Sequence, residues 1–340
     1  SCFKNIESLM KYILIGGSGF IGNHFFKKLN NDIILNLDID EGINQVKFTK
    51  CNILNPNDLN KIDLSKYDNI TVIHLAAVHF DFQKYYYETN VEGTKNILNF
   101  ISNNPQIKKY VFFSSVATYG NSEYGKDENS SQLPKNDYGK SKLEAENLIK
   151  LWHKKNQRLQ IIIVRPAVVF GEYNFGNVFN LINQIRSGVF AIIGDGRNIK
   201  SIAYAGNLVD SVLFCLKKID KKQFIYNYSD YPQQNINSQS LIISKITNQG
   251  KPIKIPLWFT KIFTLPIDLI QKLTGKDLKI NSMRVKKFIT PTYFISDKIR
   301  KHGFKQNISI KKSYEITFKW MSKKEISILR DKWYTKASKL

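Results

Sequence analysis

The sequence has few cysteines, few acidic residues and no long apolar run, and each shortage excludes a class of protein. Its three cysteines, Cys2, Cys51 and Cys215, are odd in number and scattered, which gives neither a disulfide framework nor a metal-binding spacing. No stretch of about 18 uncharged apolar residues occurs, so no segment is expected to span a membrane. No secretory signal pattern stands at its start. We therefore expect a cytoplasmic protein without a metal site.

Acidic residues are scarce beside basic ones, 28 Asp and Glu against 51 Lys and Arg, which gives a formal net charge of +23. Such an excess attracts nucleic acid, anionic lipid or a diphosphate substrate, and it also follows from a composition rich in Lys, Asn and Ile. No nucleic-acid recognition motif accompanies the charge, so we expect no nucleic-acid partner. The other three explanations stay open.

Short apolar runs alternate with segments of helical periodicity in the first half of the chain. Strands that alternate with helices form right-handed crossovers, so the pattern predicts an α/β fold with a Rossmann-type, doubly wound parallel sheet. The expected strands are 12–15, 33–37, 72–75, 110–113 and 161–164, and the expected helices are 21–29, 93–101 and 141–152.

A glycine-rich turn follows the first expected strand. Gly16, Gly19 and Gly22 have the spacing G-x-x-G-x-x-G and open an apolar helix. Glycines in this context allow positive φ, close approach of the backbone to a pyrophosphate, and tight packing of helix on strand. The turn therefore predicts a dinucleotide site at the positive end of the following helix.

Asp38 ends the second expected strand, about 20 residues beyond the glycines. A carboxylate there accepts hydrogen bonds from ribose hydroxyls and repels a 2′-phosphate, which favours NAD over NADP. Asp40 is a nearby alternative. We expect an NAD-binding Rossmann domain at 10–171. The looser pattern at 172–330 predicts mainly a smaller C-terminal substrate-binding lobe, interleaved with late Rossmann elements.

Tyr138 and Lys142 are four residues apart and share one face of an expected helix. A tyrosine is a poor base at neutral pH, but a neighbouring ammonium stabilises the phenolate and lowers its pKa toward 7. Ser115 follows the fourth expected strand, and strand ends in such sheets form the ligand crevice. Ser115 is therefore placed to bind both a substrate hydroxyl and Tyr138.

These motifs together resemble the extended short-chain dehydrogenase/reductases. The resemblance rests on the glycine turn, His-Leu-Ala-Ala at 74–77, the Asn90 motif, Ser-Ser-Val-Ala-Thr-Tyr-Gly at 114–120, Tyr-x-x-x-Lys and Arg165-Pro166. It implies NAD as a tightly held cofactor and a catalytic set of Ser115, Tyr138 and Lys142. The implied cofactor-binding residues are Gly16, Gly19, Phe20, Ile21, Gly22, Asp38, Asn52, Ile53, Leu75, Ala76, Ala77, Asn90, Ser114, Tyr138, Lys142, Arg165, Pro166 and Val168.

The second half resembles the branch of this family that epimerises an N-acetylhexosamine carried on diphospho-undecaprenol. The stretches that match are 164–172, 176–178, 200–207, 272–276 and 284–288. The dehydratase branch carries acidic residues where this chain has Val116 and Ala117, so a dehydratase is not expected. The resemblance implies a sugar diphosphate substrate, and the implied substrate-binding residues are His79, Ser115, Val116, Ala117, Asn177, Lys200 and Arg284.

Several alternatives stay open on the sequence. One is a UDP-sugar 4-epimerase; however, Val168 stands where many nucleotide-sugar epimerases have an asparagine. Another is a net oxidation or reduction, as in sugar or hydroxysteroid-like dehydrogenases. A third is a non-enzymatic NAD-binding protein, against which the intact catalytic set argues. A homodimer is compatible with all of these.

The segment Ile255–Leu273 has apolar residues near helical spacing on one face. In a strongly basic chain, this pattern predicts a helix that docks at the inner face of an anionic membrane. The alternative is a helix packed against its own domain.

Overall fold

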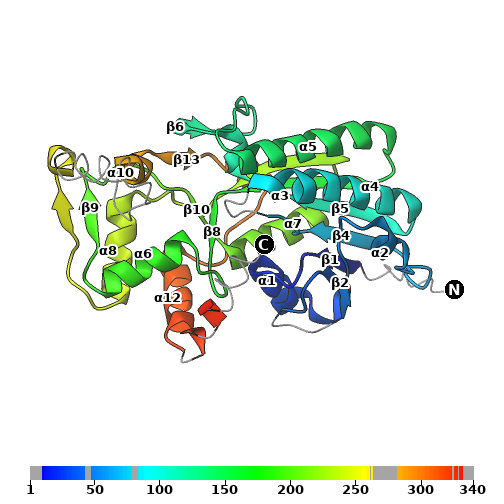
Figure 1. Cartoon of the computed structure of the whole chain (residues 1–340), viewed down its shortest axis with the longest axis horizontal. Helices are drawn as coiled ribbons and strands as arrows, with labels where there is room; N and C mark the ends of the chain where they lie inside the picture. The colour runs from blue at the N-terminus through cyan, green and yellow to red at the C-terminus, as the bar shows by residue number, and fades with distance from the viewer. Residues whose placement is uncertain are drawn as a thin grey trace.

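The computed structural model describes residues 10–42, 47–78, 83–260, 262, 282–323, 325–327 and 329–331 of the chain. They form two lobes, a larger one built on a single sheet and a smaller one made of helices and short strand pairs (Figure 1). Of the residues and stretches named above, Cys2, His79 and 272–276 lie outside the described ones, and so does the side chain of Arg284.

The larger lobe is organised by a seven-stranded sheet in the order β11-β7-β5-β4-β1-β2-β3. All neighbouring strands run parallel, as expected for the predicted doubly wound fold. The five predicted strands are confirmed within a few residues. The bounds are β1 Lys11–Ile15, β2 Ile33–Asp38, β3 Phe48–Lys50, β4 Ile70–His74, β5 Ile107–Phe113, β7 Gln160–Pro166 and β11 Gln223–Tyr228.

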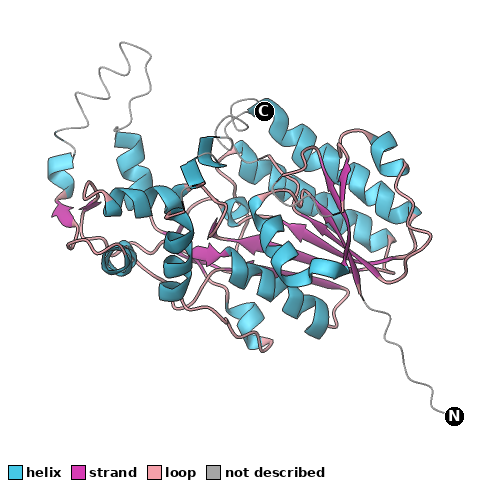
Figure 2. Cartoon of the chain, turned by 90° about the horizontal axis from the view of Figure 1, so that it is seen from below, coloured by secondary structure: helices cyan, strands magenta, loops and turns pink. Residues whose placement is uncertain are grey.

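Helices cover both faces of this sheet (Figure 2). Phe25 of α1 and Leu208 of α7 belong to the apolar core on one face, whereas Ile97 of α4 and Ile149 of α5 belong to the core on the other. The strand order reverses between β1 and β4, and the carboxyl ends of strands at such a reversal are where open parallel sheets bind ligands. The bounds are α1 Phe20–Leu29, α2 Pro56–Asn60, α3 Gln83–Tyr87, α4 Gly93–Asn103, α5 Asp137–Lys155, α7 Ala205–Lys218 and α11 Asp297–Lys301.

The smaller lobe has its own apolar core, in which Phe175 and Phe179 pack against Trp320 with ring centroids 5.4 and 6.4 Å apart. Segments distant in sequence are paired in strands here: β13 pairs with β6, and β10 with β8. The remaining bounds are β6 Ser122–Lys126, β8 Val168–Phe170, α6 Asn177–Arg186, β9 Ala191–Ile193, β10 Ile202–Tyr204, α8 Ile236–Ile246, β12 Ile253–Ile255, α10 Ser282–Ile289, β13 Thr292–Phe294 and α12 Ile310–Met321.

Chain segments after residue 171 serve both lobes, since α7 and β11 pack into the larger one. The boundary at residue 171 stays a prediction. No helix among the described residues is long and apolar enough to cross a membrane. The prediction that the amphipathic helix begins at Ile255 is wrong, because Ile255 ends β12, which pairs with β9. Residues 257–260 and 262 are helical, and the rest of the segment lies outside the described residues.

Candidate active site

The glycine turn joins β1 to α1 and lies against the end of β4. Gly16 has a φ of +80°, and a side chain there would collide with the backbone of Ala76. The amides of Leu75 and Ala76 donate to the carbonyl of Ile15 at 2.8 and 2.9 Å, which holds the two strand ends together. A Cβ on Gly19, by contrast, would meet only the carbonyl of Gly16 at 3.5 Å. The open side of the turn thus has room for a pyrophosphate, whereas its inner side has none for a side chain.

Asp38 ends β2 beside this turn, and its Oδ2 accepts a hydrogen bond from the amide of Ser18 at 3.0 Å. Its Oδ1 accepts from the amide of Ile39 at 2.8 Å. The carboxylate therefore contacts the backbone of the glycine turn at Ser18, which is the place where this fold carries its ribose-binding acidic residue. The glycine turn and the carboxylate of Asp38 together fit a dinucleotide with a free 2′-hydroxyl.

The three predicted catalytic residues come together at the end of β5. Ser115 and Tyr138 lie close enough for the serine side chain to lower the pKa of the tyrosine. Lys142 donates from Nζ to the carbonyl of Phe113 at 2.8 Å. The helix that carries Tyr138 and Lys142, α5, begins at a cap in which Asn136 Oδ1 accepts from the amide of Gly139 at 2.8 Å. The cap fixes the first turn of α5, on which Tyr138 lies.

The ionisation of this pair differs from the expectation that Lys142 lowers the pKa of Tyr138 toward 7. Burial raises the pKa of Tyr138 to about 12, and the neighbouring Ser115 opposes that rise. Burial lowers the pKa of Lys142 to about 7, and the carboxylate of Glu146 opposes that fall. The expected pKa near 7 for Tyr138 is wrong because burial penalises the charged forms of both residues, and the ammonium of Lys142 donates to a carbonyl.

Asn90 and Arg165, implied as cofactor-binding residues, have partners inside the protein. Asn90 lies in a π-helical turn at Glu88–Glu92, is buried, and donates from Nδ2 to Ser141 Oγ of α5 at 2.9 Å. Its Oδ1 accepts from the amide of Val78 at 3.0 Å. Arg165 is buried and donates from Nη2 to Glu146 at 2.6 Å. These contacts brace the catalytic helix, and contact of either residue with the cofactor stays a prediction.

The other residues predicted around the cofactor and the catalytic set are spread over several helices and strand ends. Phe20 and Ile21 open α1, and Ile53 packs against Gly93 of α4. Asn52 is exposed, and its side-chain oxygen accepts from the amide of Leu54 at 3.0 Å. Leu75, Ala76 and Ala77 follow β4, and Ser114, Val116 and Ala117 follow or flank the end of β5. Pro166 ends β7, and Val168 begins β8.

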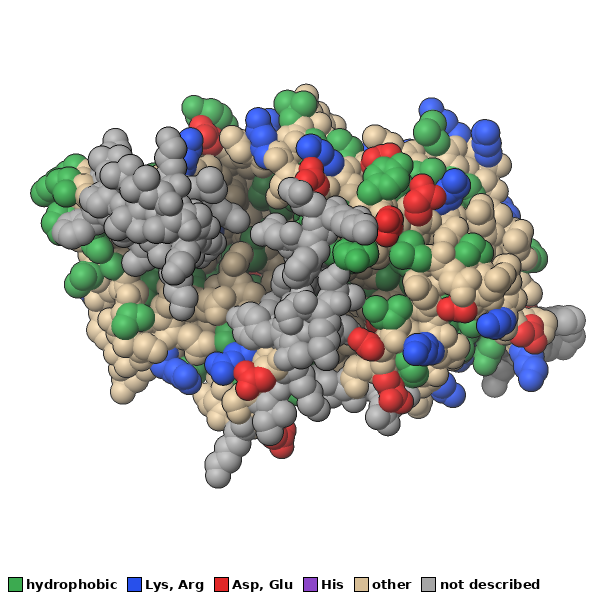
Figure 3. Space-filling view, viewed as in Figure 1, with side chains coloured by type: hydrophobic (Ala, Val, Ile, Leu, Met, Phe, Trp, Pro, Cys, Tyr) green, Lys and Arg blue, Asp and Glu red, His purple; other side chains and the backbone are tan. Residues whose placement is uncertain are grey.

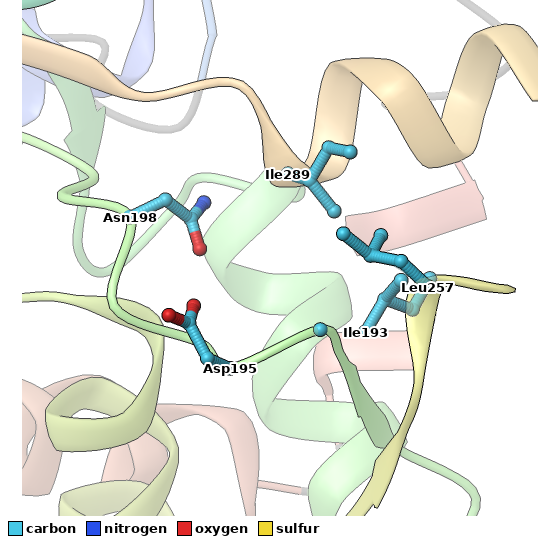
Figure 4. Close-up of a pocket in the computed structure, with 6 residues that line it drawn as sticks. Ile193, Asp195, Asn198, Leu257 and Ile289 are labelled. Carbon is cyan, nitrogen blue, oxygen red and sulfur yellow. The ribbon is translucent and has the colours of Figure 1, made fainter.

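Among the predicted substrate residues, Asn177 is exposed at the first position of α6, and Lys200 donates from Nζ to the carbonyl of Thr290 at 2.6 Å. The smaller lobe has a pocket of about 370 Å³, and part of its lining comes from residues 193–198, just before Lys200 in the chain. Figure 4 shows Asp195 and Asn198 pointing into it opposite apolar side chains, which are Ile193, Leu257 and Ile289. These elements differ from those that carry Ser115 and Tyr138, so the pocket is a separate feature of the lobe.

Sequence reasoning missed two residues beside the catalytic set. Glu146 is fully buried one helical turn beyond Lys142. Its position four residues after Lys142, on the same helix face, is a sequence signal that could have identified it. Tyr86 of α3 lies with its ring centroid 6.0 Å from that of Tyr138. Nothing in the local sequence pattern points to Tyr86, because α3 and α5 are 50 residues apart and meet only in the fold.

A parallel Rossmann sheet with a serine, a tyrosine and a lysine gathered at its strand ends defines an NAD-dependent enzyme of the short-chain dehydrogenase/reductase class. A model described as the NAD dependent epimerase/dehydratase family matches residues 12–228. The chain belongs to this family, and its cofactor is NAD.

Relatives agree with this assignment. The Escherichia coli O157:H7 protein named N-acetyl-alpha-D-glucosaminyl-diphospho-ditrans,octacis-undecaprenol 4-epimerase is 37% identical over 298 residues, which cover 86% of this chain and 89% of the relative. A UDP-glucose 4-epimerase of Vibrio cholerae is 25% identical over 285 residues, covering 77% and 85%.

Solved structures share the fold. The UDP-glucose 4-epimerase of Thermus thermophilus in complex with NAD superposes with a TM-score of 0.70 at 17% identity, covering 92% of this chain and 98% of that one. The UDP-N-acetylglucosamine 4-epimerase of Methanobrevibacter ruminantium gives a TM-score of 0.69 at 22% identity, covering 92% and 97%. At these identities the likeness concerns the fold alone.

Proposed function

We propose that this protein is the NAD-dependent 4-epimerase of an N-acetylhexosamine carried on diphospho-undecaprenol, interconverting the N-acetylglucosamine and N-acetylgalactosamine forms during O-antigen or other surface polysaccharide synthesis. The observation that carries the proposal is the 37% identity to the E. coli enzyme over 86% of the chain. The UDP-glucose 4-epimerase of V. cholerae reaches only 25%.

In the proposed reaction, Tyr138 as phenolate takes the proton from the sugar 4-hydroxyl and later returns it. Ser115 holds that hydroxyl and, as a neighbour that lowers the pKa of Tyr138, favours the phenolate. NAD bound beside these residues would supply the reversible hydride chemistry at carbon 4 of the sugar. Lys142 supplies positive charge beside the phenolate and binds the nicotinamide ribose.

Val116 and Ala117, directly after Ser115, supply no acid or base. Elimination of water from a keto sugar needs such groups, so the proposed reaction stops at proton and hydride transfer.

A peripheral position at an anionic membrane is part of the proposal, because a diphospho-undecaprenol sugar is reached at the membrane surface. Apolar side chains gather at the outer end of the smaller lobe, on the left in Figure 3. Trp258 is 64% exposed and Ile253 is 69% exposed, and Phe259 and Ile262 are exposed nearby. We call these four residues the apolar tip. Burial of these side chains in the lipid interface would supply the hydrophobic contribution to the binding free energy. Neighbouring lysines would supply the electrostatic contribution.

The substrate is tested by offering the purified protein an N-acetylglucosaminyl diphosphate on a polyprenyl carrier and UDP-N-acetylglucosamine side by side. Chromatography of the released sugars measures epimerisation. The proposal expects kcat/KM to be higher for the polyprenyl substrate. Faster epimerisation of the UDP sugar would contradict the proposal and identify the protein as a UDP-sugar 4-epimerase. Net accumulation of NADH would identify it as a dehydrogenase. The Tyr138→Phe protein, purified in the same way, controls for contaminating epimerases.

Membrane docking is tested by co-sedimentation with phosphatidylglycerol-containing vesicles. The parent protein is expected to sediment, and Trp258→Ser/Phe259→Ser is expected to stay in solution. The matched control is Tyr124→Ser, which removes an aromatic side chain that is 93% exposed but lies on β6, away from the apolar tip. Failure of the parent protein to sediment at low salt would refute docking without touching the substrate assignment.

A further inference from the structure

The end of β5 and one face of α5 are joined at three successive positions. The helix presents Tyr138, Lys142 and Glu146, which follow each other at intervals of one turn. Each of them lies beside one of three consecutive strand-end residues, and Lys142 and Glu146 are hydrogen-bonded to theirs. The pairs, in order along the helix, are Tyr138 with Ser115, Lys142 with the Phe113 carbonyl, and Glu146 with the Ser114 hydroxyl.

Glu146 is the member of this face that the proposed reaction leaves without a role, although it is 0% exposed. Arg165, at the end of the neighbouring strand β7, holds it with two parallel hydrogen bonds of 2.8 Å from Nε and 2.6 Å from Nη2. Lys150 adds a contact at 3.3 Å. Arg165 in turn donates from Nη1 to the hydroxyl of Tyr119 at 2.6 Å. A bidentate buried pair of this kind is geometrically specific, and it connects β5, β7 and α5 behind the catalytic residues.

The carboxylate of Glu146 is also a negative charge buried close to Lys142. Burial would raise the pKa of Glu146, but the hydrogen bonds and charge of Arg165 lower it below its usual value, so the group is ionised. The other titratable neighbours of Lys142 that are described are Tyr138 and His74 of β4. Burial lowers the pKa of His74 to about 3, so this ring is neutral at pH 7. Glu146 is thus the ionised neighbour that stabilises the ammonium of Lys142, beside the Phe113 carbonyl to which that ammonium donates.

We propose that Glu146 is a positioning residue for the catalytic set: through Ser114 it fixes the strand end that carries Ser115, and through its charge it stabilises the ammonium of Lys142. The strand-end contact sets where Ser115 stands relative to Tyr138. The charge sets the fraction of protein in which Lys142 can stabilise the phenolate. Both actions pass through other residues, and neither requires Glu146 to touch the substrate.

The test is the titration of Lys142 itself, followed by NMR in protein labelled with ¹³C at the lysine ε-carbons. The Lys142 signal is assigned by its absence in Lys142→Arg. Removal of the neighbouring charge in Glu146→Gln is expected to lower the pKa of Lys142 by roughly one unit or more. The matched control is Glu144→Gln, the same change at an exposed position of the same helix, which is expected to leave the titration unmoved. This readout needs no substrate, so it is independent of the proposed function.

Ser114→Ala tests the positional half, because it removes the strand-end contact and leaves both charges in place. We expect it to lower kcat by about tenfold with KM and the Lys142 titration unchanged, in line with a small misplacement of a catalytic group. If Glu146→Gln does not fold because Arg165 is left unpaired, Glu146→Gln/Arg165→Gln removes both charges and is measured instead. An unshifted Lys142 titration in a folded variant that lacks the Glu146 charge, or parent-like kcat in Ser114→Ala, would overturn the proposal.

Discussion

Replacement of Tyr138 by phenylalanine removes one oxygen atom from the centre of the site. The ring would keep its packing against Tyr86, whose centroid lies 6.0 Å away, and the helix cap at Asn136 does not involve the hydroxyl. The glycine turn and Asp38 are on other elements. We therefore expect Tyr138→Phe to fold with a Tm close to that of the parent and to keep bound NAD.

The expected loss of kcat in Tyr138→Phe depends on the role of Tyr138 as the group that accepts the proton from the substrate hydroxyl. With a pKa of about 12, ionising the tyrosine at pH 7 requires about 7 kcal/mol, because each pKa unit corresponds to about 1.4 kcal/mol. A positioned general base contributes roughly 100- to 10,000-fold to a rate, and Tyr138→Phe is expected to lose that factor in kcat. KM should change little, since Ser115 remains to bind the substrate hydroxyl.

The assay is steady-state epimerisation of the substrate that the parent turns over, measured from pH 6 to pH 9. A raised tyrosine pKa leaves little phenolate at low pH, so parent activity should increase as the pH rises. The residual activity of Tyr138→Phe should lack that increase. A variant within fivefold of the parent in kcat, or one with the parent's pH profile, would refute the assignment of Tyr138 as the base.

Three further changes have definite expected outcomes. Asp38→Ala should weaken NAD binding and reduce the preference over NADP, as measured by nucleotide extraction and calorimetric titration, because the carboxylate that repels a 2′-phosphate is gone. Gly22→Ala should abolish NAD retention and lower Tm, since a Cβ at that position collides with the backbone of Gly17. Asp230 is 1% exposed, and burial raises its pKa to about 7. A pKa raised on folding stabilises the protein below about pH 4, and this contribution is lost as the pH rises to 7. Asp230→Asn should therefore show less loss of unfolding free energy between pH 4 and pH 8 in urea titrations; an equal loss would exclude Asp230 as its source.

The central sheet could be predicted from the sequence because its strands are buried on both faces. A run such as Ile161–Val164 is apolar at every position, and the structure leaves all four residues with 0% exposure. The short pairs of the smaller lobe could not be found in this way. Strand β12 contains Lys254 between two isoleucines and pairs with three residues of β9, so its pairing depends on contacts across about 60 residues of chain.

The catalytic set could be predicted because its chemistry depends on residue types at fixed spacing, as with Tyr138 and Lys142. The groups that hold it depend on burial, which spacing does not reveal. Arg165 illustrates the difference: the sequence resemblance implies a cofactor contact, whereas in the fold its guanidinium faces Glu146 and Tyr119. A charged residue at the end of a buried strand must be paired, and the identity of the partner depends on the tertiary structure.

The ionisation of the site shows why the residues alone do not make it active. Burial favours the neutral forms of both Tyr138 and Lys142, with a pKa of about 12 for the first and about 7 for the second. Ser115 opposes the rise in the pKa of Tyr138, and the carboxylate of Glu146 opposes the fall in the pKa of Lys142, but the tyrosine stays protonated at pH 7. Formation of the phenolate therefore costs several kcal/mol, and interactions made in the transition state have to offset that cost. Variants that weaken those interactions without touching Tyr138 are expected to lower kcat before they raise KM, which steady-state kinetics measures.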